Sequence, residues 1–440
     1  MVKQPQGLSI LLKTKLESKL KNICVIGLGY IGLPTASMFA MRGFKVVGVD
    51  VNESIVATIN KGDIHIEEPG LKTIVTAAIK SGNLRASTKP VESDVFILAV
   101  PTPFKDNKLP DMSYVENATR SVVPVIKKGD LVILESTSPA GTTSKLIADI
   151  LKESKLNVEK DIYIAHCPER VLPGKILEEL IGNDRVIGGI NRESAEKAAE
   201  LYRSFVTANI FLTDATTAEL VKLVENTFRD VNIALANELA CICEKLGVNV
   251  WEVITLANKH PRVKIHNPGP GVGGHCISVD PWFIVADFPD DAKLIKTARH
   301  RNDGMPHHVV EMIKNILDDV KNPKVAILGV SYKGNVDDTR ESPSIEVIEE
   351  LRKAQFYVNI YDPHVKHFHF ELSGFEEVFR DADLVTILTD HNEFRYLDPE
   401  GVGSLMRKKI IFDTRNLINR DKWEKAGFET YLIGDGKKYH

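Results

Sequence analysis

A cysteine and an aspartate follow a glycine-rich stretch near the middle of the sequence. Residues 267–280 read Asn-Pro-Gly-Pro-Gly-Val-Gly-Gly-His-Cys-Ile-Ser-Val-Asp, so Cys276 and Asp280 come just after a loop nearly free of side chains. Such a loop lets a substrate approach the backbone closely. A single cysteine is most often a small buried hydrophobe, but this context favours a nucleophile for covalent catalysis.

The histidines around Cys276 suggest a metal site as an alternative. The residues concerned are His260, His266, His275 and Cys276. Their irregular spacing matches no common zinc arrangement, so we expect no metal cofactor.

A group of polar residues recurs at helical steps between residues 216 and 246. They are Glu219, Lys222, Asn226 and Arg229. Residues three or four apart project from one face of a helix, and on spacing alone such a face is a solvated polar stripe. The helix itself is predicted by apolar residues at the same period, which are Leu220, Leu223, Val224, Phe228, Val231, Leu235, Leu239 and Ile242. At about 45 Å, it is long enough to connect two domains and to carry a subunit interface.

A glycine fingerprint lies near the start of the chain. Gly27-Leu-Gly-Tyr-Ile-Gly32 separates a predicted strand at 22–26 from a predicted helix at 33–42. Glycines there permit a tight turn and close approach to a pyrophosphate at the helix N-terminus. Asp50 ends the next predicted strand, 45–49, where its carboxylate can accept hydrogen bonds from a ribose diol and repel a 2'-phosphate. This favours NAD over NADP, although FAD shares the fingerprint.

The pattern of apolar runs predicts an α/β protein. Runs without alternation, typical of buried parallel strands, recur at 94–100, 131–134 and 162–165. A second series follows the long helix, at 324–328, 357–361, 383–388 and 409–412. We therefore expect two Rossmann-like doubly wound domains joined by a long central helix. The second opens with Gly329-Val-Ser-Tyr-Lys-Gly334, which lacks the fingerprint and so binds another ligand.

Length and composition limit the possible functions. The 440 residues are about three times the commonest domain length, so several domains are expected. A net charge of -4 offers no broad attraction to nucleic acid or anionic membrane. Five cysteines without a CxxC pair, no membrane span and no signal peptide indicate the cytoplasm. Residues 1–20 alternate lysines and leucines, which predicts a loosely packed helical extension rather than a membrane-surface helix.

Seven motifs in order resemble the UDP-glucose/UDP-N-acetylmannosamine dehydrogenase family, from about residue 21 to 420. They are Gly27-Leu-Gly-Tyr-Ile-Gly32, Val100-Pro-Thr-Pro103, Glu135-Ser-Thr137, Pro168-Glu-Arg170, Glu219-Leu-Val-Lys-Leu-Val-Glu-Asn226, Gly273-Gly-His-Cys276 and Asp338-Thr-Arg-Glu-Ser-Pro343. The resemblance implies an NAD-binding domain at 21–210, a central dimerisation domain at 211–305 and a UDP-sugar-binding domain at 306–440, after the extension at 1–20. It also implies a homodimer or a dimer-based oligomer.

The resemblance implies a four-electron oxidation of the sugar C6 alcohol to a carboxylate through a thioester on Cys276. The implied catalytic residues are Cys276, Lys222, Asn226, Asp280, Glu169 and Thr137, and the sequence does not divide the acid and base duties among Lys222, Asp280 and Glu169. The implied cofactor residues are Gly27, Gly29, Tyr30, Ile31, Gly32, Asp50, Thr102, Thr137 and Arg340. The implied substrate residues are Arg170, Val171, Lys222, Asn226, Arg229, His260, Arg262, Gly273, Tyr332, Lys333 and Arg415, with His260 and Arg262 reaching a neighbouring subunit.

The sequence around Cys276 indicates which sugar is oxidised. Where glucose-oxidising members have Ser-Cys-Phe-Pro-Lys-Asp, this chain has His275-Cys-Ile-Ser-Val-Asp280. Together with Lys259-His-Pro-Arg-Val263, this run resembles the branch that oxidises UDP-N-acetyl-D-mannosamine to its uronate for surface polysaccharides. An N-acetylglucosamine or N-acetylgalactosamine substrate remains an alternative. So does a non-catalytic regulator that binds NAD or a UDP-sugar. A simple 2-hydroxy acid or 6-phosphogluconate-type dehydrogenase would explain neither Cys276 nor the second α/β half.

Overall fold

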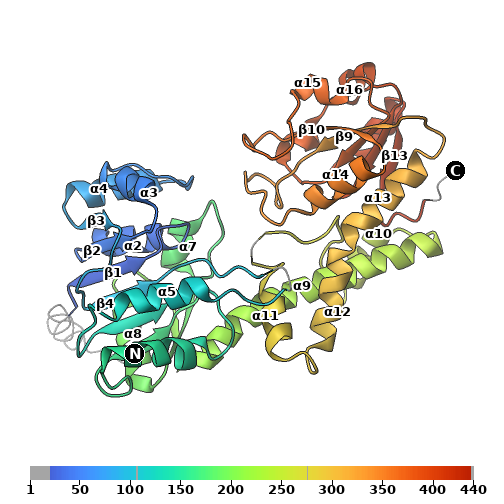
Figure 1. The fold of residues 1–440 in the computed structure, drawn as a ribbon. Helices are drawn as coiled ribbons and strands as arrows, with labels where there is room; N and C mark the ends of the chain where they lie inside the picture. Colours follow the sequence, from blue (N-terminus) through green and yellow to red (C-terminus); the bar gives the residue numbers. More distant parts are fainter. Residues whose placement is uncertain (1–19, 106–107, 275, 438–440) are drawn as a thin grey trace, which may run out of the picture. The chain divides into compact units, whose positions relative to one another are not determined.

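The structure, a computed structural model, describes residues 20–105, 108–274 and 276–437 (Figure 1). The chain divides into two compact units, Met1–Val224 and Glu225–His440, which are considered separately below. Apart from Leu20, the N-terminal extension expected over residues 1–20 lies outside the described residues.

The N-terminal unit is built on an eight-stranded sheet with the order β3-β2-β1-β4-β5-β6-β7-β8. Neighbouring strands are parallel except for β6 and β7, which are antiparallel. The order of the first six strands is that of a dinucleotide-binding domain. The strands are β1 (Asn22–Ile26), β2 (Lys45–Val49), β3 (Leu84–Ser87), β4 (Val95–Leu98), β5 (Leu131–Leu134), β6 (Tyr163–His166), β7 (Arg185–Gly189) and β8 (Ile210–Asp214).

Helices cover both faces of this sheet because alternate strand residues point to opposite sides. In β1, Ile23 and Val25 pack in a core shared with α2 and α8, whereas Cys24 and Ile26 pack in a core shared with α5 and α6. All four side chains are buried. The helices of the unit are α2 (Gly32–Met41), α3 (Glu53–Asn60), α4 (Leu71–Lys80), α5 (Ser113–Val122), α6 (Ala148–Leu151), α7 (Ile176–Gly182) and α8 (Arg192–Tyr202).

The long helix predicted over 216–246 is confirmed as α9 (Ala215–Leu246). Its 32 residues correspond to about 48 Å. The Asp214 carboxylate accepts a hydrogen bond from the Thr217 backbone N–H (2.9 Å) and thereby caps the first turn. Gly247 ends the helix with a positive φ of 71°, a conformation that costs other residues more.

The C-terminal unit contains a five-stranded parallel sheet with the order β10-β9-β11-β12-β13. Its strands are β9 (Lys324–Leu328), β10 (Tyr357–Tyr361), β11 (Leu384–Ile387), β12 (Ile410–Asp413) and β13 (Glu429–Leu432). Val325 and Ile327 pack with α13 and α14 on one face, and Ala326 and Leu328 pack with α15 and α16 on the other. The helices are α10 (Val250–Ala257), α11 (Asp280–Asp287), α12 (Lys293–Asp303), α13 (Met305–Ile316), α14 (Pro343–Lys353), α15 (Phe375–Phe379), α16 (Pro399–Leu405) and α17 (Arg420–Lys425).

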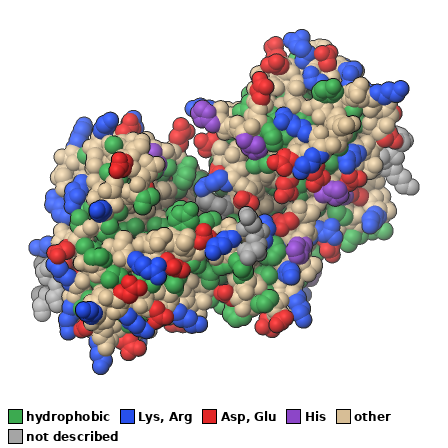
Figure 2. All heavy atoms as spheres, in the orientation of Figure 1, with side chains coloured by type: hydrophobic (Ala, Val, Ile, Leu, Met, Phe, Trp, Pro, Cys, Tyr) green, Lys and Arg blue, Asp and Glu red, His purple; other side chains and the backbone are tan. Residues whose placement is uncertain are grey.

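These observations confirm the predicted fold class, two Rossmann-like doubly wound domains and a long central helix. Within residues 20–105, 108–274 and 276–437, no helix combines the length and the apolar character needed to cross a membrane. On the face drawn in Figure 2, basic and acidic side chains are interspersed, in keeping with the small net charge of -4.

Candidate active site

The glycine turn between β1 and α2 contains two backbone contacts that exclude side chains. Gly27 has a φ of +92°, and a Cβ at this position would lie 2.3 Å from the carbonyl oxygen of Ala99. A Cβ on Gly32 would lie 1.8 Å from the carbonyl oxygen of Gly27. A Cβ on Gly29 would have no neighbour within 4 Å in the described part of the chain, so no described residue closes the backbone there to a ligand. This geometry suits a pyrophosphate at the N-terminus of α2, where Tyr30 and Ile31 complete the turn.

Asp50 lies at the carboxyl end of β2, beside the glycine turn. Its Oδ2 accepts the backbone N–H of Leu28 (3.1 Å), and its Oδ1 accepts that of Asn52 (2.9 Å). A carboxylate oxygen has two lone pairs, so each can still accept a ribose hydroxyl. The His65 imidazole also lies beside Asp50 and hydrogen-bonds to the Leu28 backbone. No motif spacing pointed to His65, because it lies in the loop between α3 and α4.

The motifs that follow β4 and β5 meet at the same edge of the sheet. These strands are parallel neighbours, so their carboxyl ends lie together. Ser136 Oγ donates to the carbonyl oxygen of Val100 (2.7 Å) and connects the two motifs directly. The expected cofactor residues Thr102 and Thr137 follow on these two segments, and both are half-buried.

Glu135, in the second of these motifs, is a buried acid that the sequence did not single out. It is 1% exposed, and its carboxylate accepts hydrogen bonds from Tyr202 Oη (2.5 Å) and Thr35 Oγ1 (3.3 Å). Burial raises the pKa of Glu135 to about 7, and the neighbouring Glu169 carboxylate contributes to the rise. The hydrogen-bonding partners are 67 and 100 residues away in sequence, so the motif that contains Glu135 could not show its burial or its partners.

Glu169 follows β6 and forms a buried ion pair with Arg185 (3.3 Å), whose side chain is 4% exposed. Glu169 Oε1 accepts the backbone N–H of Arg170 (2.6 Å), and the Arg170 guanidinium donates to the carbonyl oxygen of Asp184 (2.9 Å). Val171 packs against the core formed with α2 and α8.

The polar face of α9 is not the solvated stripe that its spacing suggests. Glu219 is fully buried, and its carboxylate accepts the backbone N–H groups of Gly141 (2.5 Å) and Thr143 (2.7 Å). Lys222, one turn later, is half-buried. The solvated stripe that spacing alone suggests is therefore wrong for Glu219, which the turn at residues 141–143 covers, whereas Arg229 on the same face is exposed.

His166, at the end of β6, is a buried histidine near Lys222. Neither ring nitrogen has a hydrogen-bonding partner among the residues that the structure describes. Burial, with a smaller contribution from the Lys222 ammonium, lowers the pKa of His166 to about 3. The imidazole is therefore neutral at physiological pH.

In the C-terminal unit, Asn226, Cys276 and Asp280 lie close together. Asn226 Nδ2 donates to Asp280 Oδ2 (2.5 Å), and both residues are buried. The carbonyl oxygen of Cys276 accepts the backbone N–H of Asp280 (2.8 Å), so the turn that carries the half-buried cysteine leads directly into α11. His275 lies outside the described residues. The structure thus brings three of the predicted catalytic residues together.

The loop before Cys276 is closely packed against Tyr332. A Cβ on Gly273 would lie 2.4 Å from the carbonyl oxygen of Glu341, and one on Gly274 would lie 2.8 Å from the Tyr332 ring. The backbone N–H of Gly274 donates to the carbonyl oxygen of Arg340 (3.1 Å). Burial raises the pKa of Tyr332 to about 12, with contributions from Asp338 and Cys276. The loop glycines are therefore required by packing as well as by access.

The remaining predicted residues of this unit are mostly cationic. Lys333 and Arg229 are exposed, and the Arg340 guanidinium is paired with the Asp338 carboxylate (2.6 Å). The Nε of Arg415 donates to the carbonyl oxygen of Leu388 (2.8 Å). His260 and Arg262 lie exposed after α10, where the backbone N–H of Arg262 donates to His260 Nδ1 (3.3 Å).

Comparison with known proteins matches three successive parts of the chain to three domains of one family. The sequence matches the UDP-glucose/GDP-mannose dehydrogenase family in its NAD binding domain over residues 21–206, its central domain over 216–304 and its UDP binding domain over 326–420. It is 55% identical over 424 residues to UDP-N-acetyl-D-mannosamine dehydrogenase of Methanocaldococcus jannaschii, covering 95% of this chain and 97% of the relative.

Two further proteins are similar over most of the chain. NDP-N-acetyl-D-galactosaminuronic acid dehydrogenase of Ralstonia nicotianae is 50% identical over 411 residues, covering 90% of this chain and 96% of the relative. The solved structure of UDP-D-ManNAc dehydrogenase from Pyrococcus horikoshii has a TM-score of 0.89 and 46% identity, covering 94% of this chain and 99% of that one. Similarity of this extent shows that the chain belongs to the UDP-glucose/GDP-mannose dehydrogenase family and is an NAD-dependent oxidoreductase of that family.

Proposed function

We propose that the protein oxidises UDP-N-acetyl-D-mannosamine at C6 to UDP-N-acetyl-D-mannosaminuronate, a four-electron reaction that passes through a thioester on Cys276. The observation that carries the proposal is the arrangement of Asn226, Asp280 and Cys276 beside a loop of glycines. The names of the M. jannaschii and P. horikoshii relatives support the choice of sugar.

Cys276 keeps the reaction on the enzyme between its two oxidation stages. NAD would be held at the glycine turn between β1 and α2, by Gly27, Gly29 and Gly32 with Asp50, and would supply the hydride acceptor for each of the two oxidation stages. The Cys276 thiolate adds to the C6 aldehyde and gives a thiohemiacetal, which prevents loss of a reactive aldehyde. Loss of the second hydride gives the thioester. Water then adds to it, releasing the carboxylate and regenerating the thiol.

We assign stabilisation of charge on the C6 oxygen and proton transfer to Lys222, Asn226, Asp280, Glu169 and Thr137. The Lys222 ammonium and the Asn226 amide donate to the oxyanion, a contribution of about 3 to 4 kcal/mol for one donor. Asp280 holds the Asn226 amide through the hydrogen bond of 2.5 Å. Glu169, with Thr137, activates the hydrolytic water. The candidates for general acid and general base are Lys222, Asp280 and Glu169, and we do not divide the two duties among them.

The two α/β domains divide the ligands between them. We assign residues 21–210 to NAD, 211–305 to dimerisation and 306–440 to the UDP-sugar. Lys333, Arg229 and Arg415 provide positive charge for a diphosphate, and Asp50 binds the adenosine ribose of NAD. Cys24, Cys167, Cys241 and Cys243 are unbridged thiols, which suits the reducing cytoplasm where we place the enzyme.

A panel of UDP-hexosamines tests this function. With NAD in excess, limiting UDP-N-acetyl-D-mannosamine should yield two NADH per sugar, followed by absorbance at 340 nm, and a uronate product identified by mass spectrometry. Its kcat/KM should exceed that of UDP-glucose at least about 100-fold. UDP-glucose lacks the N-acetyl group at C2, so the protein groups that bind this amide would be left unpaired, at a cost of several kcal/mol.

Other outcomes of this assay favour other functions. A preference for UDP-N-acetylgalactosamine, suggested by the R. nicotianae relative, would replace the sugar while keeping the mechanism. One NADH per sugar, or an aldehyde product, would contradict the thioester. Tight binding of every sugar without NADH formation would indicate a regulator.

We further propose that a second copy of the chain covers an apolar stripe on α9. The stripe consists of exposed residues at helical spacing, which are Leu220, Val224, Phe228, Leu235, Ile242 and Leu246. Phe228 is 61% exposed, which is unusual for so large an apolar side chain on a helix. A homodimer would bury the same stripe from both copies. It would also allow His260 and Arg262 to reach the partner's active site.

Replacing Leu235 and Ile242 with aspartate should convert the dimer into a monomer. Both side chains lie at least two turns from Asn226, so the substitution introduces buried charge into the interface without touching the site. Size-exclusion chromatography with light scattering measures the mass. Tyr396→Asp is the control, because Tyr396 is 82% exposed on the segment 392–396, away from α9. A wild-type monomer, or an unchanged mass in the double variant, would contradict the proposed interface.

A further inference from the structure

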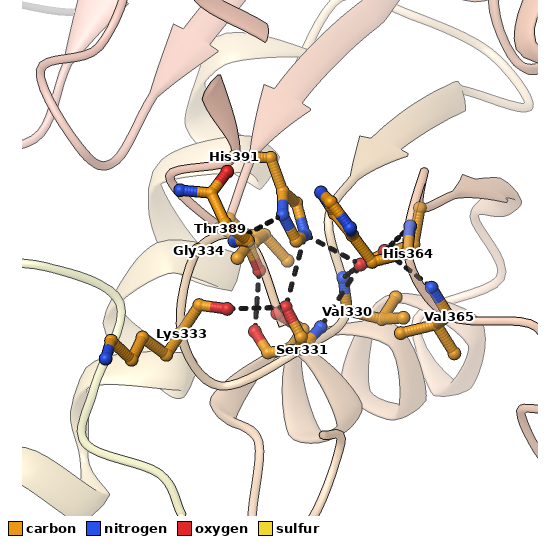
Figure 3. A network of polar contacts seen from close by, with 12 residues as sticks. Val330, Ser331, Lys333, Gly334, His364, Val365, Thr389 and His391 are labelled. Carbon is orange, nitrogen blue, oxygen red and sulfur yellow. Dashed lines mark hydrogen bonds and ion pairs between the residues drawn. The ribbon is translucent and has the colours of Figure 1, made fainter. Parts of the chain in front are cut away.

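A buried polar network lies at the carboxyl end of the C-terminal sheet, behind the loop that carries Lys333 (Figure 3). His391 and Asp362 have fully buried side chains and lie 3.0 Å apart, between His391 Nε2 and Asp362 Oδ2. They follow β11 and β10, whereas the Lys333 loop follows β9. Three neighbouring strands thus contribute to one cluster.

The hydrogen bonds of His391 determine its tautomer. Its Nδ1 accepts the backbone N–H of Asn335 (2.9 Å), so this nitrogen carries no proton. The proton is therefore on Nε2, which donates to Asp362 Oδ2. The same carboxylate oxygen accepts the backbone N–H of Val330 (2.8 Å). Although burial opposes it, these hydrogen bonds lower the pKa of Asp362 to about 2, so the acceptor stays ionised.

In this hydrogen-bonding pattern His391 does not act as a metal ligand. Ligand atoms of His364, His391 and Glu393 lie within 4.8 Å of one another, a spacing that would allow a cation. Both ring nitrogens of His391 are already used, one as an acceptor and one as a donor. The cluster is therefore a hydrogen-bonding network, in which His364 stacks on His391 with ring centroids 4.8 Å apart.

The backbone on both sides of Lys333 is held by this network. Before Lys333, the Ser331 carbonyl oxygen accepts a hydrogen bond from Thr389 Oγ1 (2.7 Å). At Lys333 itself, the carbonyl oxygen accepts Ser331 Oγ (2.8 Å). After it, the N–H of Gly334 donates to Asp390 Oδ1 (3.1 Å), and that of Asn335 donates to His391. The Lys333 side chain is exposed and points away from the cluster (Figure 3).

We infer that His391 is a positioning residue for the nucleotide diphosphate, acting through the backbone of the Lys333 loop. A lysine side chain has four rotatable bonds, so its ammonium reaches a fixed point only if its own backbone is held. His391 Nδ1 accepts the backbone N–H of Asn335 and thereby holds the loop at a point two residues after Lys333. This inference rests on the proposed function, because it takes Lys333 as the diphosphate ligand.

Two conservative substitutions separate the hydrogen bonds of His391. In His391→Asn the amide oxygen takes the place of Nδ1 and can still accept the Asn335 N–H. In His391→Gln the side-chain amide takes the place of Nε2 instead, and the acceptor for Asn335 is lost. Calorimetric titration with UDP should show Kd raised at least about tenfold in His391→Gln and less than about threefold in His391→Asn. The KM for UDP-sugar should follow the same order, whereas kcat and the KM for NAD should change less than about threefold.

Two further variants distinguish positioning from a loss of stability. Asp383 is a fully buried carboxylate at the opposite end of the sheet, where it accepts the Lys324 N–H (2.9 Å) and pairs with Arg407. Asp383→Asn should lower the melting temperature and leave the Kd for UDP unchanged. In a Lys333→Met background, His391→Gln should add less than about twofold to Kd, because both changes remove the same contact.

The outcomes distinguish this inference from the proposed function. Unchanged Kd in His391→Gln, additive effects with Lys333→Met, or an equal rise in Asp383→Asn would each overturn it. If the wild type binds UDP and the His391 variants change its Kd as expected, but the wild type oxidises no UDP-hexosamine, the inference stands and the proposed function fails. If the wild type does not bind UDP, both fail.

Discussion

Replacing Cys276 with alanine or serine is expected to stop release of the uronate. Alanine removes the nucleophile, and a serine hydroxyl is far less ionised than a thiol at neutral pH, so neither can carry the thioester. The rate of uronate formation, measured by chromatography of the reaction mixture, should fall by at least about three orders of magnitude. NADH formed per sugar should be one or fewer instead of two.

Cys241→Ser is the matched control for this prediction. Cys241 is a half-buried thiol on α9 that packs against the core of the C-terminal sheet. Its replacement should leave kcat and the NADH stoichiometry unchanged. A Cys276→Ala protein that releases uronate within tenfold of the wild-type rate would remove Cys276 from the proposed role.

Asp280→Asn is expected to lower kcat by about 100- to 10,000-fold, the range observed for general acid–base groups. Asparagine has the same shape as aspartate but cannot exchange a proton. Its neutral amide oxygen is also a weaker acceptor for the Asn226 Nδ2–H than the Asp280 carboxylate is. Position 280 lies one turn from Cys276. The KM values for NAD and UDP-sugar should change little, because the variant retains the backbone turn. Steady-state NADH formation under saturating substrates measures the effect.

The same assay on Asp383→Asn controls for the loss of a buried carboxylate. That variant should be destabilised but should keep its kcat, since Asp383 binds Arg407 and the Lys324 backbone at the far end of the sheet. Asp280→Asn with wild-type kcat, or with kcat lost only in proportion to unfolding, would contradict a role for Asp280 in proton transfer.

The secondary structure could be predicted where a local pattern determines it. The strands expected at 22–26, 45–49 and 324–328 agree with β1, β2 and β9 at every residue. In each case a glycine or an aspartate directly follows the buried apolar run and marks where the strand ends. Strand β8 was not predicted. Its residues are exposed or half-buried at the edge of the sheet, so they lack the apolar signal of a central strand.

Sequence spacing also identified the backbone features of the site but not its buried polar contacts. The glycines of the cofactor turn and of the Cys276 loop were recognised because the backbone geometry requires them locally. The burial of Glu219 depends on a turn 76 to 78 residues earlier, and the contact between Ser331 and His391 spans 60 residues. Such contacts exist only once the chain has folded, so periodicity alone gave the wrong environment for Glu219 and Asn226 on the polar face of α9.

The continuity of α9 has a consequence for insertions and deletions. Lys222 and Asn226 are four residues apart on an unbroken helix, so their separation along the axis, about 6 Å, is fixed by backbone hydrogen bonds. One inserted residue between them would turn the amide by roughly 100° away from the lysine. An insertion or deletion in a loop leaves this spacing unchanged, whereas one between Lys222 and Asn226 changes both the distance and the angle between the two side chains. Only substitutions of the residues between them preserve the spacing.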